Sequence, residues 1–270
     1  MSFNSLRERQ KSYEEAYDHK LLRRVPVMIR VDGANFTRFC RDLQKPYEPL
    51  ILEALAQSML ISISDMSGAI FGYAQSDEIT FVLRNDQSLE SDPWHDNKIQ
   101  KISSRTASMV TENFNEIVKS IDPKLPVVGK AYFDCICWPM PSIGEVVNNI
   151  IDRQKSCIND SVTKSCIKIL TNKFGKKTAI KMVKSSSLDE KIDLMYEHEK
   201  IVYEDDFPSS FRRGIGVYKV PSVVNTADGI ITKNKWKLDW DLPLFNFEGK
   251  DFLHHLITTG HDVFREDYLK

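Results

Sequence analysis

Long hydrophobic runs are absent from this 270-residue chain. A membrane-spanning helix needs roughly eighteen or more consecutive apolar residues, and no window of the sequence approaches that length. The first ten residues also lack the apolar core of a signal peptide. We therefore expect a cytoplasmic protein that makes no contact with a membrane.

Cysteine is scarce as well, with five residues in the chain. An odd and small number argues against a disulfide framework, so we expect reduced thiols. Cys135 and Cys137 stand two positions apart in an apolar run, which places their side chains on opposite faces of one strand. That placement argues against a zinc ion shared by the two thiols.

Glycine and proline are infrequent, at 11 each, and neither sign of charge dominates. With 41% hydrophobic residues, the composition is typical of a packed globular protein and not of a disordered or fibrous one. A net charge of −1 argues against a protein coated in basic surface, but Lys and Arg cluster locally in residues 164–184 and 211–214. Such clusters leave binding of a polyanion open, while solvated helix faces are the other interpretation.

The hydrophobic pattern of the first half predicts alternating strands and helices. Strand-like apolar runs cover residues 25–29, 69–73, 79–83 and 131–138, and amphipathic helices are predicted over residues 48–66 and 98–120. The order strand, helix, strand, strand, helix, strand is that of the ferredoxin-like βαββαβ fold. We therefore predict an α+β protein whose antiparallel sheet carries its helices on one face.

The second half is predicted to be mostly helical, with a small hairpin after it. Helices are expected over residues 146–175, 177–185 and 188–199, the hairpin strands over 216–220 and 236–240, and an N-terminal helix over 5–24. We expect two parts: a palm-like catalytic domain over residues 1–140, and a helical extension over residues 141–270, whose C-terminal hairpin and tail pack on the palm.

Two acidic segments adjoin the predicted strands. Arg30-Val31-Asp32-Gly33 follows the first strand, and Gln75-Ser76-Asp77-Glu78 precedes the third. In a βαββαβ sheet the first and third strands are adjacent and antiparallel, so the end of one lies beside the start of the other. The topology therefore predicts that Asp32 lies next to Asp77 and Glu78.

Carboxylates gathered in this way are suited to Mg²⁺, which takes one or two acidic ligands and fills its shell with water and phosphate oxygens. Two such ions support in-line displacement at phosphorus, which favours nucleotidyl transfer. Gly33 would let the backbone come close to a metal or a phosphate. The alternative is that Asp-Gly and Ser-Asp merely form turns at strand ends.

Several short motifs follow one another along the chain. They are Ile29-Arg30-Val31-Asp32-Gly33-Ala34-Asn35-Phe36 with Lys45-Pro46, Tyr73-Ala74-Gln75-Ser76-Asp77-Glu78-Ile79-Thr80-Phe81, Phe133-Asp134, Arg153-Gln154, Lys191 with Asp193, and Phe211-Arg212-Arg213-Gly214-Ile215-Gly216-Val217-Tyr218. This ordered set, which spans about residues 8 to 220, resembles the tRNA-His guanylyltransferase superfamily of reverse (3′-to-5′) polymerases. The resemblance implies a polymerase palm that adds nucleotides to the 5′ end of tRNA or a tRNA-like RNA.

The resemblance also implies roles for individual residues. Asp32 and Asp77 would hold two Mg²⁺ ions together with the Gly33 carbonyl, and Glu78 would act beside them. The implied nucleotide-binding residues are Arg30, Gly33, Asn35, Phe36, Lys45 and Ser76. The implied contacts to RNA or phosphate are Arg153, Lys191, Arg212 and Arg213. ATP and GTP or another nucleoside triphosphate would be substrates, and the family implies a homotetramer.

Three departures from the family pattern point to a branch within it. Where eukaryotic members carry a His-Ile-Asn-Asn-type motif, this chain has Cys157-Ile158-Asn159-Asp160-Ser161, and Ile136 and Ala74 replace the family's Arg and Gly. The chain is thus more similar to the guanylyltransferase-like branch, which resembles a template-directed repair enzyme for tRNAs with incomplete 5′ ends.

Two alternative functions stay open. A palm-fold transferase or cyclase could act on a substrate other than RNA. A non-catalytic RNA-binding protein could use the same ferredoxin-like sheet, but it would need exposed aromatic residues on the two central strands. Phe81 is the only ring in those two predicted runs.

Overall fold

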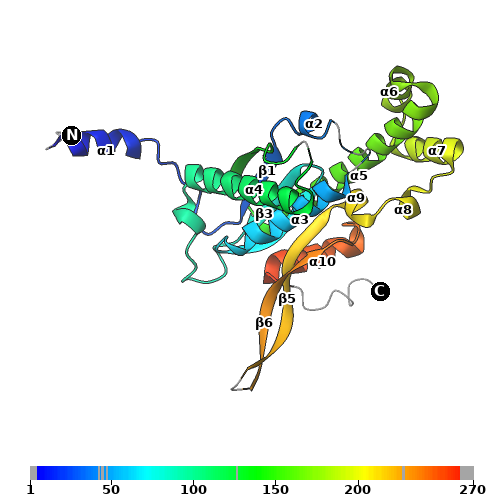
Figure 1. Ribbon diagram of the computed structural model, residues 1–270. Helices are drawn as coiled ribbons and strands as arrows, with labels where there is room; N and C mark the ends of the chain where they lie inside the picture. Colours follow the sequence, from blue (N-terminus) through cyan, green and yellow to red (C-terminus); the bar gives the residue numbers. More distant parts are fainter. Residues whose placement is uncertain are drawn as a thin grey trace.

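The computed structural model describes residues 5–41, 43, 46, 48–125, 127–226 and 229–261. Within them, one antiparallel sheet has the strand order β4-β1-β3-β2-β5-β6 (Figure 1). The palm strands are β1 (Val27–Gly33), β2 (Ala69–Gln75), β3 (Glu78–Leu83) and β4 (Phe133–Pro139). The helices between them are α2 (Phe36–Phe39), α3 (Pro49–Ser64), the 3₁₀ helix η1 (Trp94–Asn97) and α4 (Ile99–Ile121).

The four palm strands confirm the predicted ferredoxin-like order. β1 and β3 are neighbours, with Val27 opposite Leu83 at one end of the pair and Asp32 opposite Glu78 at the other. β1 runs four residues beyond the predicted strand, to Gly33, because β3 and β4 both continue to pair with it there. The first acidic segment is therefore part of the strand and not of a loop.

One face of the sheet packs against α3 and α4, as predicted. Side chains alternate along a strand, so Ile29 and Val31 of β1 point to this face together with Phe81 of β3. Leu55 of α3 and Phe114 of α4, both inaccessible to solvent, fill the layer between helices and sheet. Phe81 therefore belongs to the core and not to an exposed platform for bases.

The opposite face is covered by helices of the second half, α5 (Ile143–Phe174) and α10 (Phe247–Thr259). Met28 and Tyr73 of the sheet pack there with residues that include Ile150 of α5 and Leu256 of α10. No helix was predicted over residues 247–259, although Phe252, Leu253, Leu256 and Ile257 have helical spacing. Both faces of the sheet are thus buried.

The rest of the second half forms a helical arm and a long hairpin (Figure 1). The arm contains the C-terminal part of α5 and the helices α6 (Lys176–Lys184), α7 (Leu188–Glu199), α8 (Tyr203–Asp206) and α9 (Ser209–Arg213). Its own small core includes Leu170, Val183 and Met195. The helices predicted for this segment are confirmed to within a few residues.

The hairpin consists of β5 (Ile215–Thr226) and β6 (Gly229–Asp239), so it is more than twice as long as predicted. It joins the main sheet, because Ile215 to Tyr218 pair with four residues of β2. Beyond Tyr218, β5 pairs with β6 alone among the described strands. The division of the chain into two parts at residue 140 stays a prediction, although the hairpin shares its sheet with the palm.

The N-terminal helix α1 (Leu6–Glu15) is shorter than the predicted span of 5–24. The chain after it is held in other contacts: Ile99 donates its N–H to His19, Leu21 donates to Asn97, and Lys98 pairs with Asp18 at 2.5 Å. These contacts to residues 97–99 replace helical hydrogen bonds. Of the helices that the structure describes, none is long and apolar enough to span a membrane.

Arg84, just after β3, ties the sheet to the last turn of α10. Its guanidinium donates to the carbonyl oxygens of Ile257 at 3.1 Å and Thr258 at 2.7 Å, and binds both carboxylate oxygens of Asp86 at 2.8 Å. The side chain is buried, so these bonds satisfy helix-terminal carbonyls that water cannot reach.

Replacement of Arg84 by Met should therefore destabilise the protein, since it leaves Asp86 and two carbonyls unpaired. We expect a loss of about 3 kcal/mol in the free energy of unfolding, measured by urea denaturation. The control is Lys119→Met, which removes an exposed pair with Glu116 and should cost less than about 0.5 kcal/mol. Equal effects of the two variants would contradict the role given to Arg84.

The same contact predicts a dependence on pH. The hydrogen bond from Arg84, together with its charge, lowers the pKa of Asp86 below the usual value for aspartate. A depressed folded-state pKa contributes stability that is present above the unfolded pKa of about 4 and is lost as pH falls through the folded pKa. The stability difference between wild type and Arg84→Met should narrow between about pH 5 and pH 3 in urea titrations. A stability difference that does not change with pH would show that the Asp86 carboxylate contributes nothing to the stability of the protein.

Candidate functional site

Four carboxylates gather where β1 ends. Asp32 lies opposite Glu78 of β3 on one side and opposite Asp134 of β4 on the other. Asp77 occupies the β2–β3 turn, and its carbonyl oxygen accepts a 3.0 Å hydrogen bond from the N–H of Gly33. The antiparallel pairing thus joins two segments that are far apart in the sequence, which confirms the predicted neighbourhood of Asp32, Asp77 and Glu78.

The electrostatics of this cluster favour a bound cation. The pKa of Asp32 is raised, first by burial and then by the negative charges of Asp77, Glu78 and Asp134, while Arg30 opposes the shift. A carboxylate held among like charges is stabilised by a positive ion, and carboxylate and carbonyl oxygens are the ligands that Mg²⁺ prefers. The residues present therefore fit a magnesium ion.

Within the residues described, no group of three or more His, Cys, Asp or Glu side chains is arranged to hold a metal on its own. Mg²⁺ commonly takes one or two carboxylates and completes its shell with water and substrate phosphate oxygens. Asp32, Asp77 and the Gly33 carbonyl are the candidate ligands.

Glu78 is set apart from the other acids by two arginines. Its carboxylate lies 3.5 Å from Arg30 Nε and accepts a 3.4 Å hydrogen bond from Arg153 Nη1. Thr80 donates to the same carboxylate at 3.4 Å, and the Arg30 guanidinium also lies over the ring of Trp138. Glu78 is buried, so its charge is balanced inside the protein. One carboxylate therefore contacts both Arg30 and Arg153. The family resemblance implied nucleotide binding for Arg30 and contacts to RNA or phosphate for Arg153.

Gly33 is required for a reason that the sequence did not suggest. A Cβ atom at this position would lie 2.4 Å from the ring of Phe36, which begins α2. The chain turns between them through Asn35, whose φ of 54° is in the left-handed region. The ring of Phe36 then packs with Phe39, Phe114 and other core rings. Gly33 and Phe36 thus fix the direction in which the chain leaves the acids.

The β2–β3 turn connects the acids to α5. Ser76 has a φ of 53°, which is uncommon for a residue other than glycine, and its Oγ accepts a 2.9 Å hydrogen bond from Lys164 Nζ. Asp160, one turn earlier on α5, lies 3.4 Å from the same ammonium group. Backbone strain of this kind is often found at functional sites.

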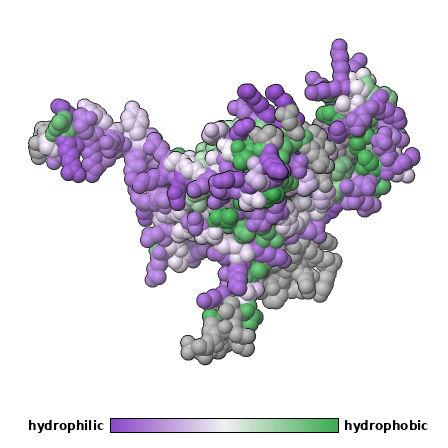
Figure 2. Space-filling model, in the orientation of Figure 1, coloured by the Kyte–Doolittle hydropathy of each residue, from purple (hydrophilic) through white to green (hydrophobic). Residues whose placement is uncertain are grey.

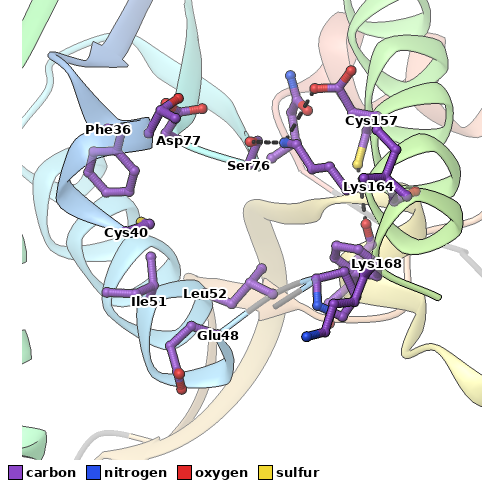
Figure 3. Close-up of a pocket in the computed structure, with 18 of the residues that line it drawn as sticks. Phe36, Cys40, Glu48, Ile51, Leu52, Ser76, Asp77, Cys157, Lys164 and Lys168 are labelled. Carbon is purple, nitrogen blue, oxygen red and sulfur yellow. Dashed lines mark hydrogen bonds and ion pairs between the residues drawn. The ribbon is translucent and has the colours of Figure 1, made fainter. Parts of the chain in front are cut away.

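A cavity of about 480 Å³ opens between the turn, α3 and α5 (Figure 3). Asp77, Ser76 and Phe36 line one side, and α5 faces them with Lys164 and Lys168. Apolar wall residues include Ile51, Leu52, Ile167 and Phe211. A cavity with an apolar wall, lysines and adjacent carboxylates is suited to a nucleoside triphosphate, whose base is flat and apolar and whose tail is anionic.

Other predicted site residues lie in separate contacts. Lys191 of α7 donates to Thr163 of α5 at 3.1 Å. Arg212 is buried, where it pairs with Glu204 and donates to the Phe207 carbonyl at 2.8 Å. Arg213 lies 3.5 Å from the same Glu204. Their roles toward RNA stay predictions, and Lys45 lies outside the described residues.

Several functional candidates were missed from the sequence. Asp134 was noted only as part of a motif, and its position opposite Asp32 depends on strand register. Lys164 and Lys168 were part of a general basic cluster, but their spacing of four residues puts both on one face of α5. Gln154 is buried and joins three segments: it accepts from the Phe245 N–H at 2.7 Å and donates to the carbonyls of Pro243 and Arg213.

The three departures from the family pattern occupy different surroundings. Ile136 is exposed on β4, opposite Arg30, and Ile158 lies on α5 next to Cys157, which lines the cavity. Ala74 is buried in β2. Burial raises the pKa of the Cys157 thiol to about 12, so this thiol stays protonated at neutral pH and cannot replace the missing His as a proton acceptor.

Comparisons with known proteins agree with these motifs. A family model described as tRNAHis guanylyltransferase matches residues 7–141, half of the chain. A probable tRNA(His) guanylyltransferase from Dictyostelium discoideum is 25% identical over 239 residues, which cover 87% of this chain and 90% of that protein.

Two solved structures of bacterial tRNA(His) guanylyltransferase-like protein, one in complex with ATP and one with GTP, share the fold. Their TM-scores are 0.77 and 0.69, at 27% and 26% identity, and each match covers 94% of this chain and 99% of the other. The fold, the ordered motifs and the family match agree, and the chain belongs to the tRNAHis guanylyltransferase family of nucleotidyltransferases.

Proposed function

We propose that this protein is a metal-dependent 3′-to-5′ nucleotidyltransferase that adds nucleotides to the 5′ end of tRNA or a tRNA-like RNA. The 3′-hydroxyl of an incoming nucleoside triphosphate attacks the 5′ phosphorus of the RNA, and AMP or pyrophosphate leaves, depending on whether the 5′ end was adenylylated or triphosphorylated. The observation that carries the proposal is the position of Asp77, which adjoins Asp32 and Gly33 and also lines the cavity.

Asp32, Asp77 and the Gly33 carbonyl would hold Mg²⁺. The ions would lower the pKa of the attacking hydroxyl and neutralise charge on the phosphates. Asp32 and Asp77 supply the negative charge that attracts the ions. Arg30 and Arg153 hold Glu78 in place beside them through ion pairs with its carboxylate.

The cavity would take the nucleoside triphosphate. Lys164 and Lys168 present positive charge from α5, and Ser76 is held toward Lys164 by their hydrogen bond. Phe36, Leu52 and Phe211 provide apolar surface for the base. The ATP and GTP complexes of the bacterial guanylyltransferase-like protein support binding of a nucleoside triphosphate by a protein of this fold. Asn35 and Lys45 remain predicted nucleotide contacts.

Repair of incomplete 5′ ends, rather than dedicated maturation of tRNA-His, is the substrate we favour. Cys157-Ile158-Asn159-Asp160 stands where the eukaryotic motif begins with His, and the protonated Cys157 thiol does not supply a basic group. Lys191, Arg212 and Arg213 stay predicted contacts to RNA or phosphate. The tetramer and the cytoplasmic location that the family implies also remain predictions.

A transferase or cyclase that uses the same site without RNA is the main alternative. Mass spectrometry of reactions with ATP, GTP and Mg²⁺ but no RNA would reveal its products. A non-catalytic RNA-binding sheet is disfavoured, because Phe81 is buried against the helices and the other face is covered by α5 and α10.

Removal of the α5 lysines should weaken nucleotide binding. We expect each of Lys164→Ala and Lys168→Ala to raise the Kd for Mg-ATP by about ten-fold, since one charge-assisted phosphate contact contributes about 1.4 kcal/mol. Isothermal titration calorimetry would measure it. Lys155→Ala on an exposed face of the same helix, outside the cavity, is the matched control. An unchanged Kd in both cavity variants would rule out this binding mode.

Loss of either metal acid should abolish catalysis without harming the fold. With a 5′-truncated tRNA, ATP, the other nucleoside triphosphates and Mg²⁺, we expect Asp32→Asn and Asp77→Asn to extend the RNA at least about a thousand-fold more slowly than wild type. Asp32→Asn should melt no lower than wild type, because it relieves like-charge repulsion. The exposed substitution Glu112→Gln is the control. Absence of any 5′-extended product with wild type, or full activity in both variants, would refute the proposal.

A further inference from the structure

Gln154 is a buried polar side chain of α5 that the proposed reaction does not use. Its amide makes three hydrogen bonds, all with backbone groups. It donates to the carbonyl oxygens of Arg213 at 3.3 Å and Pro243 at 3.0 Å, and it accepts from the N–H of Phe245 at 2.7 Å. Both amide hydrogens and the amide oxygen are thus engaged. A buried network of this kind makes the backbone segments that it joins rigid.

One of those segments is α9, which forms part of the cavity wall. Ser210 and Phe211 of this helix line the cavity. A helix of five residues is not stable on its own, and its last carbonyl groups have no partner within the helix. The position of this wall must therefore come from side chains of neighbouring elements.

Three side chains bind carbonyl groups in the last turn of α9. The Arg213 carbonyl accepts from Gln154 and also, at 2.9 Å, from the Tyr73 hydroxyl. The Phe211 carbonyl accepts from the Cys157 thiol at 3.6 Å (Figure 3). Gln154 and Cys157 are three residues apart on α5, so they present one face of that helix to α9. Burial raises the pKa of Tyr73, so its hydroxyl keeps the proton that it donates.

The chain leaves α9 through Gly214, close to the Tyr73 ring. Gly214 has a φ of 81°, and a Cβ atom there would lie 2.5 Å from the Tyr73 hydroxyl oxygen. Glycine is therefore required both by the backbone conformation and by the close approach. Tyr73 belongs to β2, which ends at Gln75, directly before the turn that carries Asp77. One strand thus fixes the cavity wall and one of the proposed metal ligands.

A merely structural role, in which Gln154 attaches the C-terminal segment to the palm, fits less well. α10 already packs on the sheet through four residues that are at most 1% exposed: Phe252, Leu253, Leu256 and Ile257. This apolar contact holds α10 without a polar bond. Within α9, all of whose residues the structure describes, Arg212 is the only buried one. Loss of the Gln154 bonds should therefore affect α9 more than α10.

We propose that Gln154 positions Phe211 so that its ring packs on the base of the bound nucleoside triphosphate. The inference rests on the proposed function, which places the nucleotide in the cavity. Figure 2 shows hydrophobic surface in the middle of the molecule, over α3 and toward the helical arm, with hydrophilic residues around it. Lys164 and Lys168 lie ten and fourteen residues beyond Gln154, about 15 and 21 Å along α5. A change at Gln154 should therefore leave the phosphate-binding lysines in place.

The test separates the base from the phosphates. Isothermal titration calorimetry measures Kd for Mg-ATP and for Mg-tripolyphosphate, which has the phosphates but no base. Gln154→Met keeps the approximate shape of the side chain and removes its three hydrogen bonds. We expect Kd for Mg-ATP to rise about five-fold or more, as for the loss of one base–aromatic contact. Kd for Mg-tripolyphosphate should stay within about two-fold of the wild-type value, because the lysine contacts are unchanged.

A double-mutant cycle tests whether Gln154 acts through Phe211. Phe211→Ala should also weaken the binding of Mg-ATP but not of Mg-tripolyphosphate. Addition of Gln154→Met to Phe211→Ala should then raise Kd no further, because the positioned ring is already absent. Tyr73→Phe removes the other donor to the Arg213 carbonyl and should show the same preference with a smaller effect. If Gln154→Met does not fold, Tyr73→Phe and its cycle with Phe211→Ala decide the question.

The control for a general loss of stability is Arg84→Met. Arg84 lies at the other end of β3 from the acids, and its replacement should destabilise the protein without touching the cavity wall. We expect wild-type Kd values for both ligands at a temperature where circular dichroism shows that each variant is folded.

Equal rises of the two Kd values in Gln154→Met, or no rise in either, would overturn the inference. So would additive effects in the double-mutant cycle, because Gln154 would then act independently of Phe211. Failure of the proposed function looks different: wild type would bind Mg-ATP and the cycle would stay as expected, but no RNA would be extended. Wild type that binds no Mg-ATP would overturn both.

Discussion

Everything at the site depends on the antiparallel pairing of β1 with β3. That register sets Asp32 opposite Glu78, and through the β2–β3 turn it places Asp77 against the N–H of Gly33. β4 on the other side of β1 adds Asp134. A slip of one residue would turn Asp32 toward the α3 and α4 core and bring Val31 to the site, so the hydrophobic alternation that fixes the core also fixes the acids.

Carboxylates that lie close together repel one another, and the surroundings of Glu78 and Asp32 differ in how they respond to this repulsion. Glu78, which is buried, is paired with Arg30 and Arg153. Asp32 has no such arginine pair among the residues that the structure describes, and burial together with its acidic neighbours raises its pKa. Glu78 is thus balanced by arginines of the protein, whereas Asp32 is the acid whose charge we propose a cation balances. This division of roles explains why stability and activity are expected to respond in opposite directions when Asp32 becomes Asn.

Much of the palm could be predicted from the sequence because its strands and helices have distinct hydrophobic periods, and because the βαββαβ order has one strand arrangement that puts Asp32 beside Asp77. The features that the sequence did not predict are those that depend on three-dimensional contacts. The extent of β1 depended on pairing by β4, the end of α1 on contacts with residues 97–99, and the length of the hairpin on strands that have almost no core of their own. The need for glycine at position 33 depended on the place of the Phe36 ring, which no linear pattern reports.

The central claim is that the end of β1 and the β2–β3 turn form a metal-dependent nucleotide site. It is tested most directly by a crystal structure of the protein with a non-hydrolysable ATP analogue and Mn²⁺, in which anomalous scattering locates the ions. The account predicts anomalous peaks within coordination distance of the Asp32 and Asp77 carboxylates, with the triphosphate directed toward Lys164 and Lys168. A nucleotide bound in the cavity with no ion at either carboxylate, or ions bound elsewhere, would contradict it.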